Sequence, residues 1–310
     1  MRIAIVGQSD FGKSVLEAFH GRGDVVAGVF CAPEKPGPAP DPLRLAAQAL
    51  HIPVYQFGSL KTEDARQTLR SLGTDLGVMA YVLQFAPQDF VTIPRRGTIQ
   101  YHPSLLPRHR GPSSINWPII RGDLRTGLSI FRPTDGLDEG PVILQKETAI
   151  GADDTLGSVY FDRLFPMGIA ALLEAADMVV KGGVEGEAQD ESQATYEGWC
   201  REGEARINWR NHVDLIYNLI RGCDPSPAAW TLFKGKKLQL HAARKHTSRT
   251  FGEVKGAVGA VSAIGPQSIF VTAQGGQIEV SKLRWAGGKK LPAPQACAEA
   301  GISAGAVLGV

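Results

Sequence analysis

Short apolar stretches alternate with amphipathic ones along the first 182 residues. The pattern predicts strands at Arg2–Val6, Val25–Phe30, Leu76–Met79, Gly97–Tyr101, Thr126–Arg132 and Val142–Ala149. It predicts helices at Gly12–Arg22, Pro42 to His51, Thr62–Leu72, Ser114–Arg121 and Thr155–Lys181. Strands alternating with helices are typical of an open sheet with helices on both faces. We therefore expect an α/β fold with a Rossmann-like, mostly parallel sheet.

The pattern changes after Lys181. Gly182–Ser192 is polar and glycine-rich, which is typical of a linker, and a further helix is predicted at Val213–Ile220. Five short β-rich runs with glycine turns between several of them follow at Ala229–Phe233, Lys237–Ala242, Gly259–Ile264, Ile269–Thr272 and Gln277–Arg284. Such runs indicate a small barrel. We expect an α/β domain over 1–182, a linker over 183–205 and an OB-like β-barrel domain over 206–310.

Composition places the chain among soluble globular proteins of about two domains, since 43% of its 310 residues are hydrophobic and 21% are charged. Its four cysteines are far apart and form no CxxC pair, and its seven histidines show no ligand spacing. A disulfide framework and a metal site are therefore not expected. No signal-peptide pattern follows Met1, and no apolar run approaches the ~20 residues that span a bilayer. We expect a cytoplasmic protein with no membrane partner.

Charge is unevenly distributed. From Arg206 to Val310 there are 14 Lys/Arg and 5 Asp/Glu, a net charge of +9, so the rest of the chain must carry −7 to give the total of +2. The C-terminal part could meet an anion such as RNA, a phosphate or the glutamate tail of a folate, or it could present a solvated basic face.

One phosphate-binding pattern is present. Gly7–Ser14 matches GxxxxGK[ST] between a predicted strand and a predicted helix. A P-loop NTPase also needs an aspartate at the end of another strand to hold magnesium. Val25–Phe30 is followed by Cys31, and the Leu76–Met79 strand has its aspartate at the start. We therefore expect neither ATP nor a metal as cofactor. The dinucleotide fingerprint GxGxxG is absent as well.

One histidine and one aspartate stand out from the rest. His102 ends an apolar run within Gln100–Gly111 (QYHPSLLPRHRG), and Asp138 lies in the glycine-bounded turn Asp135–Gly140 (DGLDEG). A carboxylate beside an imidazole fixes its tautomer and favours its protonated form, so the pair can accept a proton and return it.

These two segments resemble the signature of the folate-dependent formyltransferase family. The resemblance implies a formyltransferase fold in which 1–182 is the catalytic domain, and a reaction that takes the formyl group from 10-formyltetrahydrofolate. His102 and Asp138 would carry the proton transfers. The family has asparagine two residues before the histidine, whereas this chain has Gln100. The longer side chain keeps the amide donor, so it could reach the oxyanion or point elsewhere.

The resemblance also implies a folate slot. In the family, the segment after the fourth strand and the loop with the catalytic aspartate build it. The corresponding residues here are Tyr81, Val82, Leu83, Gln84 and Phe85, together with Thr134, Asp135 and Gly136. The side chains of Leu83 and Phe85 could wall a flat pterin ring, or they could be core residues at a strand end.

Three residues near His102 carry further charge. We expect His109 to lie at the surface rather than in the site. We expect Arg108 and Arg110 to form a solvated charge cluster; the alternative is that they anchor an anionic acceptor.

The family resemblance leaves the acceptor open. The chain is most similar to the hydrolase domain of 10-formyltetrahydrofolate dehydrogenases, which also lacks the usual asparagine. The similarity rests on the segments YHPSLLPRHRG, Ile115–Trp117 and Thr195–Gly198. This favours water as acceptor, giving formate and tetrahydrofolate. Because the sequence ends at Val310, we expect no dehydrogenase reaction. The alternative is a formyltransferase to an amine, with methionyl-tRNA first and an amino sugar second. Ala32–Pro40 lacks the basic insertion expected of tRNA-contacting members. A non-catalytic folate-binding protein is the third possibility.

Overall fold

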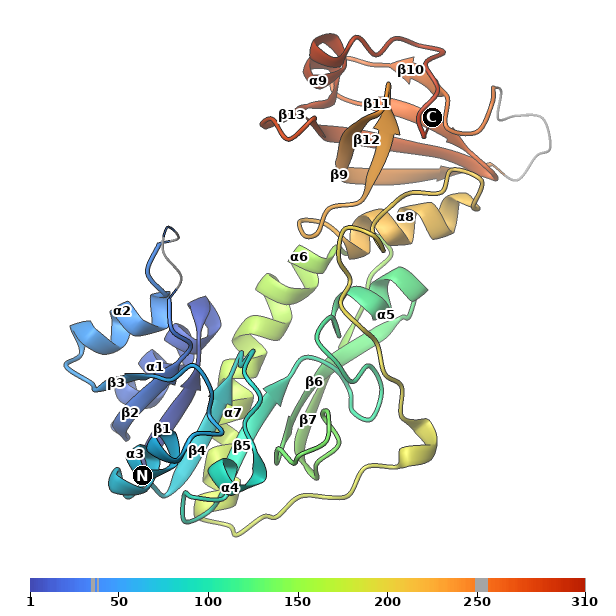
Figure 1. Ribbon diagram of the computed structural model, residues 1–310. Helices are drawn as coiled ribbons and strands as arrows, with labels where there is room; N and C mark the ends of the chain where they lie inside the picture. Colours follow the sequence, from blue (N-terminus) through green and yellow to red (C-terminus); the bar gives the residue numbers. More distant parts are fainter. Residues whose placement is uncertain (35–36, 38, 249–255, 310) are drawn as a thin grey trace. The chain divides into compact units, whose positions relative to one another are not determined.

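The computed structural model describes residues 1–34, 37, 39–248 and 256–309 (Figure 1). The chain forms two compact units. The first contains Met1–Gly111, Gly127–Thr148 and Phe161–Tyr196, and the second contains Pro112–Thr126, Ala149–Tyr160 and Glu197–Val310. Pro112–Thr126 and Ala149–Tyr160, which lie in the predicted α/β range, thus group with the C-terminal residues. No change of composition in the sequence indicates this grouping.

The first unit is built on a seven-stranded sheet of order β3-β2-β1-β4-β5-β6-β7. Its strands are β1 (Arg2–Gly7), β2 (Val25–Cys31), β3 (Val54–Gln56), β4 (Leu76–Ala80), β5 (Thr98–His102), β6 (Arg125–Phe131) and β7 (Val142–Ala149). The pairs from β3 to β5 are parallel, and β6 joins β5 antiparallel. The expected Rossmann-like sheet is confirmed.

Helices cover both faces of this sheet. They are α1 (Ser9–Gly21), α2 (Pro42–Ala49), α3 (Glu63–Ser71), α4 (Gln88–Val91) and α7 (Phe165–Val180). Alternate residues of β1 point to opposite faces. Ile3 and Ile5 pack in one apolar cluster with residues of α1 and α7, whereas Ala4 and Val6 pack in another with residues of α3 and α4. The continuous apolar character of β1 follows from this two-sided burial.

The predicted helix Thr155–Lys181 is interrupted, so that prediction is wrong in detail. The chain forms α6 (Leu156–Val159), a π-helical turn over Tyr160–Leu164, and then α7. Pro166 lies in the first turn of α7. Proline has no backbone N–H and clashes with the preceding turn, so a regular α-helix cannot run through this position.

The glycines of the phosphate-binding pattern have a packing role. A Cβ on Gly7 would lie 2.2 Å from the Ala80 carbonyl oxygen, and one on Gly12 would lie 3.0 Å from Leu43. The backbone N–H of Ser9, at the start of α1, donates to the Asp41 carboxylate at 2.8 Å. This helix end therefore already holds an anionic group of the protein itself.

The second unit contains an antiparallel sheet that curls into a half-barrel. Its order is β10-β11-β12-β9-β8, with β13 paired to β12. The strands are β8 (Trp230–Phe233), β9 (Lys236–Thr247), β10 (Val261–Ile264), β11 (Ile269–Ala273), β12 (Gly276–Trp285) and β13 (Lys290–Pro292). The helices are α5 (Asn116–Arg121), the short α6, α8 (Val213–Gly222) and α9 (Ala293–Ala300). The predicted small β-rich domain is confirmed, although β9 extends beyond the predicted Ala242 and β13 and α9 were not foreseen.

One half-buried carboxylate fastens the turn after α8 to β9. Asp224 accepts hydrogen bonds at 2.9 Å from the Ala242 N–H and from His241 Nδ1. Burial alone would raise the pKa of Asp224, but the bonds from His241 and Ala242 outweigh it and lower this pKa below its ordinary value. Hydrogen bonds to the ionised form thus stabilise the fold wherever the carboxylate is charged.

We expect Asp224→Asn to lower the free energy of unfolding at pH 7 by about 1–2 kcal/mol, because each lost bond contributes about 1 kcal/mol. The contribution is complete above the unfolded-state pKa of about 3.9 and is lost as the pH falls through the lower folded-state pKa. Thermal melts of both proteins from pH 7 down to pH 3 check this. The difference in Tm should shrink below about pH 4; a difference that stays constant would contradict it.

No helix in the described ranges is long and apolar enough to cross a membrane.

Candidate active site

His102 is the last residue of β5, at the carboxyl edge of the parallel strands. Its ring is 5% exposed, and Asp138, in the loop between β6 and β7, is 9% exposed. His102 Nδ1 lies 3.6 Å from Asp138 Oδ2. Gln100, two residues earlier on the same strand, points to the same face of the sheet as His102. The structure therefore brings His102 and Asp138 together, and β5 presents Gln100 on the same face as His102.

Asp138 is held in an unusual conformation. Its φ of 55° lies in the left-handed region, which Asp tolerates better than most residues. Oδ2 accepts a hydrogen bond from the Gly111 N–H at 2.9 Å, and the Asp138 carbonyl accepts one from Gln189 Nε2 at 2.9 Å. These bonds hold the carboxylate facing His102.

The tautomer of His102 follows from the hydrogen bond that its other ring nitrogen makes. Its Nε2 lies 2.9 Å from the His109 carbonyl oxygen, which can only accept, so Nε2 carries the proton. In the neutral ring, Nδ1 is then the atom with the free lone pair. The 3.6 Å between Nδ1 and Asp138 Oδ2 is too long for a direct hydrogen bond. The base atom of the pair thus faces the carboxylate and remains available to a third group.

Side chains from β6 and β7 fix the loop after His102. Ser104 donates to the Arg108 carbonyl at 2.7 Å, and Ser129 donates to the Ser104 carbonyl at 2.7 Å. The Leu106 N–H donates to Ser129 Oγ at 3.0 Å, and Gln145 Nε2 donates to the Leu106 carbonyl at 2.8 Å. No local sequence pattern indicates that Ser129 and Gln145 fix this loop, because both lie far from it along the chain.

Two sequence-based expectations about the following residues are wrong. His109 is 8% exposed rather than at the surface, and its carbonyl contacts the His102 ring. Arg110 is 0% exposed and binds Gln189, Glu191 and Tyr196, so it belongs to no solvated cluster. Arg108 alone of the three is exposed. The predicted linker supplies the partners that bury Arg110.

The predicted folate-binding residues meet at the same edge of the sheet. In the parallel register of β4 and β5, Met79 lies opposite Gln100, and Tyr81 directly follows the carboxyl end of β4, where the chain turns with a φ of 60°. Tyr81, Leu83 and Phe85 are 47%, 55% and 49% exposed.

Other predicted folate-binding residues hold the surrounding loops in place. Gln84 Nε2 donates to the Phe57 carbonyl at 2.9 Å, and Val82 is half-buried. Asp135 accepts from the Gln88 N–H at 2.9 Å and so ties its loop to the start of α4. The buried Thr134 hydroxyl has no partner among the described residues, and Gly136 leaves room for Glu139. The two predicted segments are therefore neighbours.

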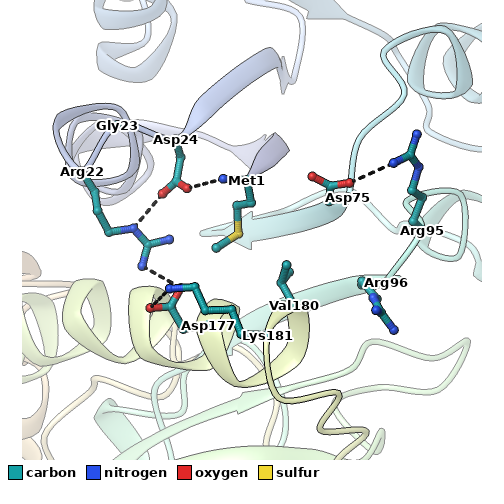
Figure 2. A pocket seen from close by; sticks show the side chains of 10 residues that line it. All are labelled: Met1, Arg22, Gly23, Asp24, Asp75, Arg95, Arg96, Asp177, Val180 and Lys181. Atoms are coloured by element: carbon teal, nitrogen blue, oxygen red, sulfur yellow. Dashed lines mark hydrogen bonds and ion pairs between the residues drawn. The ribbon is translucent and has the colours of Figure 1, made fainter.

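A charged cleft of about 620 Å³ lies elsewhere in the first unit. Figure 2 shows its lining, in which Met1 and Arg22 pair with Asp24 and Arg95 pairs with Asp75. These residues precede β1, β2, β4 and β5, so the cleft opens at the amino edge of the sheet, opposite His102. It takes no part in this site. Within the described residues, no three His, Cys, Asp or Glu side chains are grouped to hold a metal ion.

Two family models together match most of the chain. Residues 1–175 match the family model described as formyl transferase, and residues 201–301 match that of the formyl transferase C-terminal domain. The chain is 37% identical over 306 residues to mitochondrial 10-formyltetrahydrofolate dehydrogenase of Homo sapiens, covering 95% of this chain and 33% of that protein. It is 41% identical over 253 residues to the cytosolic 10-formyltetrahydrofolate dehydrogenase of Homo sapiens, covering 80% of this chain and 28% of that protein. The chain thus spans about a third of the length of these curated relatives.

A third relative matches along its whole length. Methionyl-tRNA formyltransferase of Geotalea daltonii is 32% identical over 314 residues, covering 100% of this chain and 98% of that protein. Among solved structures, HypX from Aquifex aeolicus in complex with tetrahydrofolic acid superposes with a TM-score of 0.69 at 17% identity, covering 96% of this chain and 47% of HypX. WlaRD, a sugar 3N-formyl transferase, superposes with a TM-score of 0.68 at 16% identity, covering 91% of this chain and 97% of WlaRD. These two solved structures have the same fold as this chain. The sequence matches show more than the fold: the chain belongs to the formyl transferase family.

Proposed function

We propose that the protein transfers the formyl group of 10-formyltetrahydrofolate to water, releasing formate and tetrahydrofolate. The observation that carries this proposal is the nearly buried His102–Asp138 pair, whose base atom and carboxylate face each other 3.6 Å apart. A water molecule can hydrogen-bond to both atoms at once, since each would lie within ordinary hydrogen-bond distance of it. The likeness to two 10-formyltetrahydrofolate dehydrogenases supports the same donor.

The chemistry then runs through a tetrahedral intermediate. His102 Nδ1 takes a proton from the water as its oxygen bonds to the formyl carbon, and Asp138 stabilises the imidazolium. The carbonyl oxygen becomes an oxyanion. When the bond from the formyl carbon to N10 breaks, N10 takes the proton from Nδ1, giving tetrahydrofolate and formic acid, which ionises to formate. One water is consumed and no electrons are exchanged.

The pterin would lie on the apolar side chains after β4. Tyr81, Leu83 and Phe85 follow the carboxyl end of β4 and expose flat or branched apolar surface, and monomeric proteins rarely leave such side chains grouped without a ligand. Gly136 and the main chain of its loop would supply polar contacts to the ring edge.

The Gln100 amide is the proposed oxyanion donor. Among the residues that the structure describes, none accepts a hydrogen bond from this amide, and its strand position directs it to the His102 face. We expect Gln100→Ala to lower kcat by about 10²-fold, the usual effect of removing one oxyanion donor. Steady-state kinetics beside Gln67→Ala, an exposed glutamine on α3, check this. Equal rates in both variants would remove Gln100 from the mechanism.

Transfer to an amine is the second candidate. The residues from 206 onward carry 14 Lys/Arg against 5 Asp/Glu, and exposed Trp199 lies 5.3 Å below the Arg201 guanidinium, a pairing suited to nucleic acid. The full-length match to a methionyl-tRNA formyltransferase favours tRNA as the carrier of that amine. Binding of charged methionyl-tRNA that weakens steeply with salt would support this candidate.

Product analysis tests the proposal. Purified protein, 10-formyltetrahydrofolate and buffer free of amines should yield formate and tetrahydrofolate in equal amounts. If no formate appears while folate still binds, the hydrolase proposal is wrong and the non-catalytic alternative gains support.

A further inference from the structure

The main chain of residues 109–111 holds both proposed catalytic side chains. The His109 carbonyl accepts from His102 Nε2 at 2.9 Å, and the Gly111 N–H donates to Asp138 Oδ2 at 2.9 Å. A shift of this short segment would therefore move the imidazole and the carboxylate together. Arg110 lies between these two contacts.

The Arg110 side chain is fully enclosed. It is 0% exposed and binds groups on residues 189–196, which we call the strap. Its guanidinium meets the Glu191 carboxylate through two bonds, of 2.6 and 2.9 Å, and Gln189 Oε1 through bonds of 2.8 and 3.2 Å. The Tyr196 hydroxyl is a further partner. The Glu191 carboxylate raises the pKa of Arg110, and Arg110 in turn lowers the pKa of Glu191.

Further bonds join the strap to the same loop. Thr195 accepts from the Arg110 N–H at 2.9 Å through its carbonyl and from the His109 N–H at 2.8 Å through its hydroxyl. Gln189 contributes twice, because its Oε1 accepts from Arg110 while its Nε2 donates to the carbonyls of Asp138 and Gly140 at 2.9 and 2.7 Å. The His102 side and the Asp138 side are thus connected through Arg110 and Gln189.

We propose that Arg110 is a positioning residue: by binding the strap it fixes the main chain that orients His102 and Asp138. The role rests on the proposed function of that pair. Lysine cannot replace the planar guanidinium of Arg110. Its ammonium is a point charge, whereas the guanidinium makes five hydrogen bonds in fixed directions. Removal of the guanidinium would also take away the partner of the Glu191 carboxylate and of the Gln189 amide oxygen.

Kinetics of Arg110→Met and Arg110→Lys test the proposal. We expect kcat for formate release to fall by about 10²-fold in the methionine variant and by about tenfold in the lysine variant, because small misplacements of catalytic groups cost this much. KM for the folate should change less than kcat. Arg132→Met is the matched control, since Arg132 binds the carbonyls of Val184 and Glu185 just before the strap and does not contact residues 109–111. Its kcat should stay near wild type.

A spectroscopic signal separates positioning from folding and from the reaction itself. Nitrogen-15 NMR of the His102 ring, assigned by its loss in His102→Ala, should show the proton on Nε2 in the wild type and a mixture of tautomers in the Arg110 variants. If Arg110→Met does not fold, Glu191→Gln serves instead, because the Glu191 side chain is 62% exposed. A folded variant with wild-type kcat and tautomer would overturn the positioning role. Absence of formate release by the wild type would overturn the proposed function, while the NMR signal would still decide the role of Arg110.

Discussion

Replacing His102 with alanine is expected to slow formate release from 10-formyltetrahydrofolate by about 10⁴-fold, the upper end of what general acid–base catalysis contributes. In the proposed reaction one ring performs both proton transfers, since Nδ1 would take the proton from water and return it to N10. The His109 main-chain carbonyl accepts from the other ring nitrogen, Nε2, which leaves Nδ1 as the basic atom. Steady-state rates of formate release give the measurement.

A matched control separates this effect from general damage. His20 is exposed at the end of α1 and has no part in the site, so His20→Ala should keep wild-type kcat. The folate dissociation constant of His102→Ala should change little, because the apolar side chains after β4 remain. A drop in rate of less than tenfold would show that His102 is not the base.

Replacing Asp138 with asparagine is expected to lower kcat by about 10³-fold, through lost stabilisation of the imidazolium. Asparagine is the informative replacement because it also tolerates a φ of 55° and can still accept from the Gly111 N–H. The loop geometry is therefore kept while the charge is removed. Asp138→Ala would mix this effect with backbone strain.

The matched control is Asp64→Asn, an exposed carboxylate on α3 for which kcat should not change. Equal thermal midpoints for Asp138→Asn and the wild type would show that the loop is intact. If Asp138→Asn retained more than a tenth of the wild-type rate, the carboxylate would have no catalytic role and His102 would have to act alone.

Much of the fold could be predicted because its signals are local. The apolar run of β1, the Asp41 N-cap and the glycine turns of the second unit each act within a few residues. The break before α7 was also visible in principle, since Pro166 cannot continue a helix. β13 has three residues and α9 begins directly after it, so neither leaves a periodic pattern long enough to recognise.

The site was predictable only in part. His102 and Asp138 stand out by their motifs, and the parallel pairing of β4 with β5 explains why Tyr81 and His102 both lie at the carboxyl edge of the sheet. The strap did not stand out, because Gln189 and Glu191 lie in a polar stretch that is typical of a linker. Their function depends on a contact with Arg110 across some eighty residues, and no local pattern records such a partner.

The choice of acceptor is the central claim, and isotope labelling tests it most directly. The purified protein is given 10-formyltetrahydrofolate in ¹⁸O-water, together with charged methionyl-tRNA and, separately, an amino sugar nucleotide. The proposed function predicts formate that carries one ¹⁸O atom, formed at the same rate with and without either amine, and no formylated amine. Formylated methionyl-tRNA or formylated sugar, with no labelled formate in the absence of an amine, would contradict it.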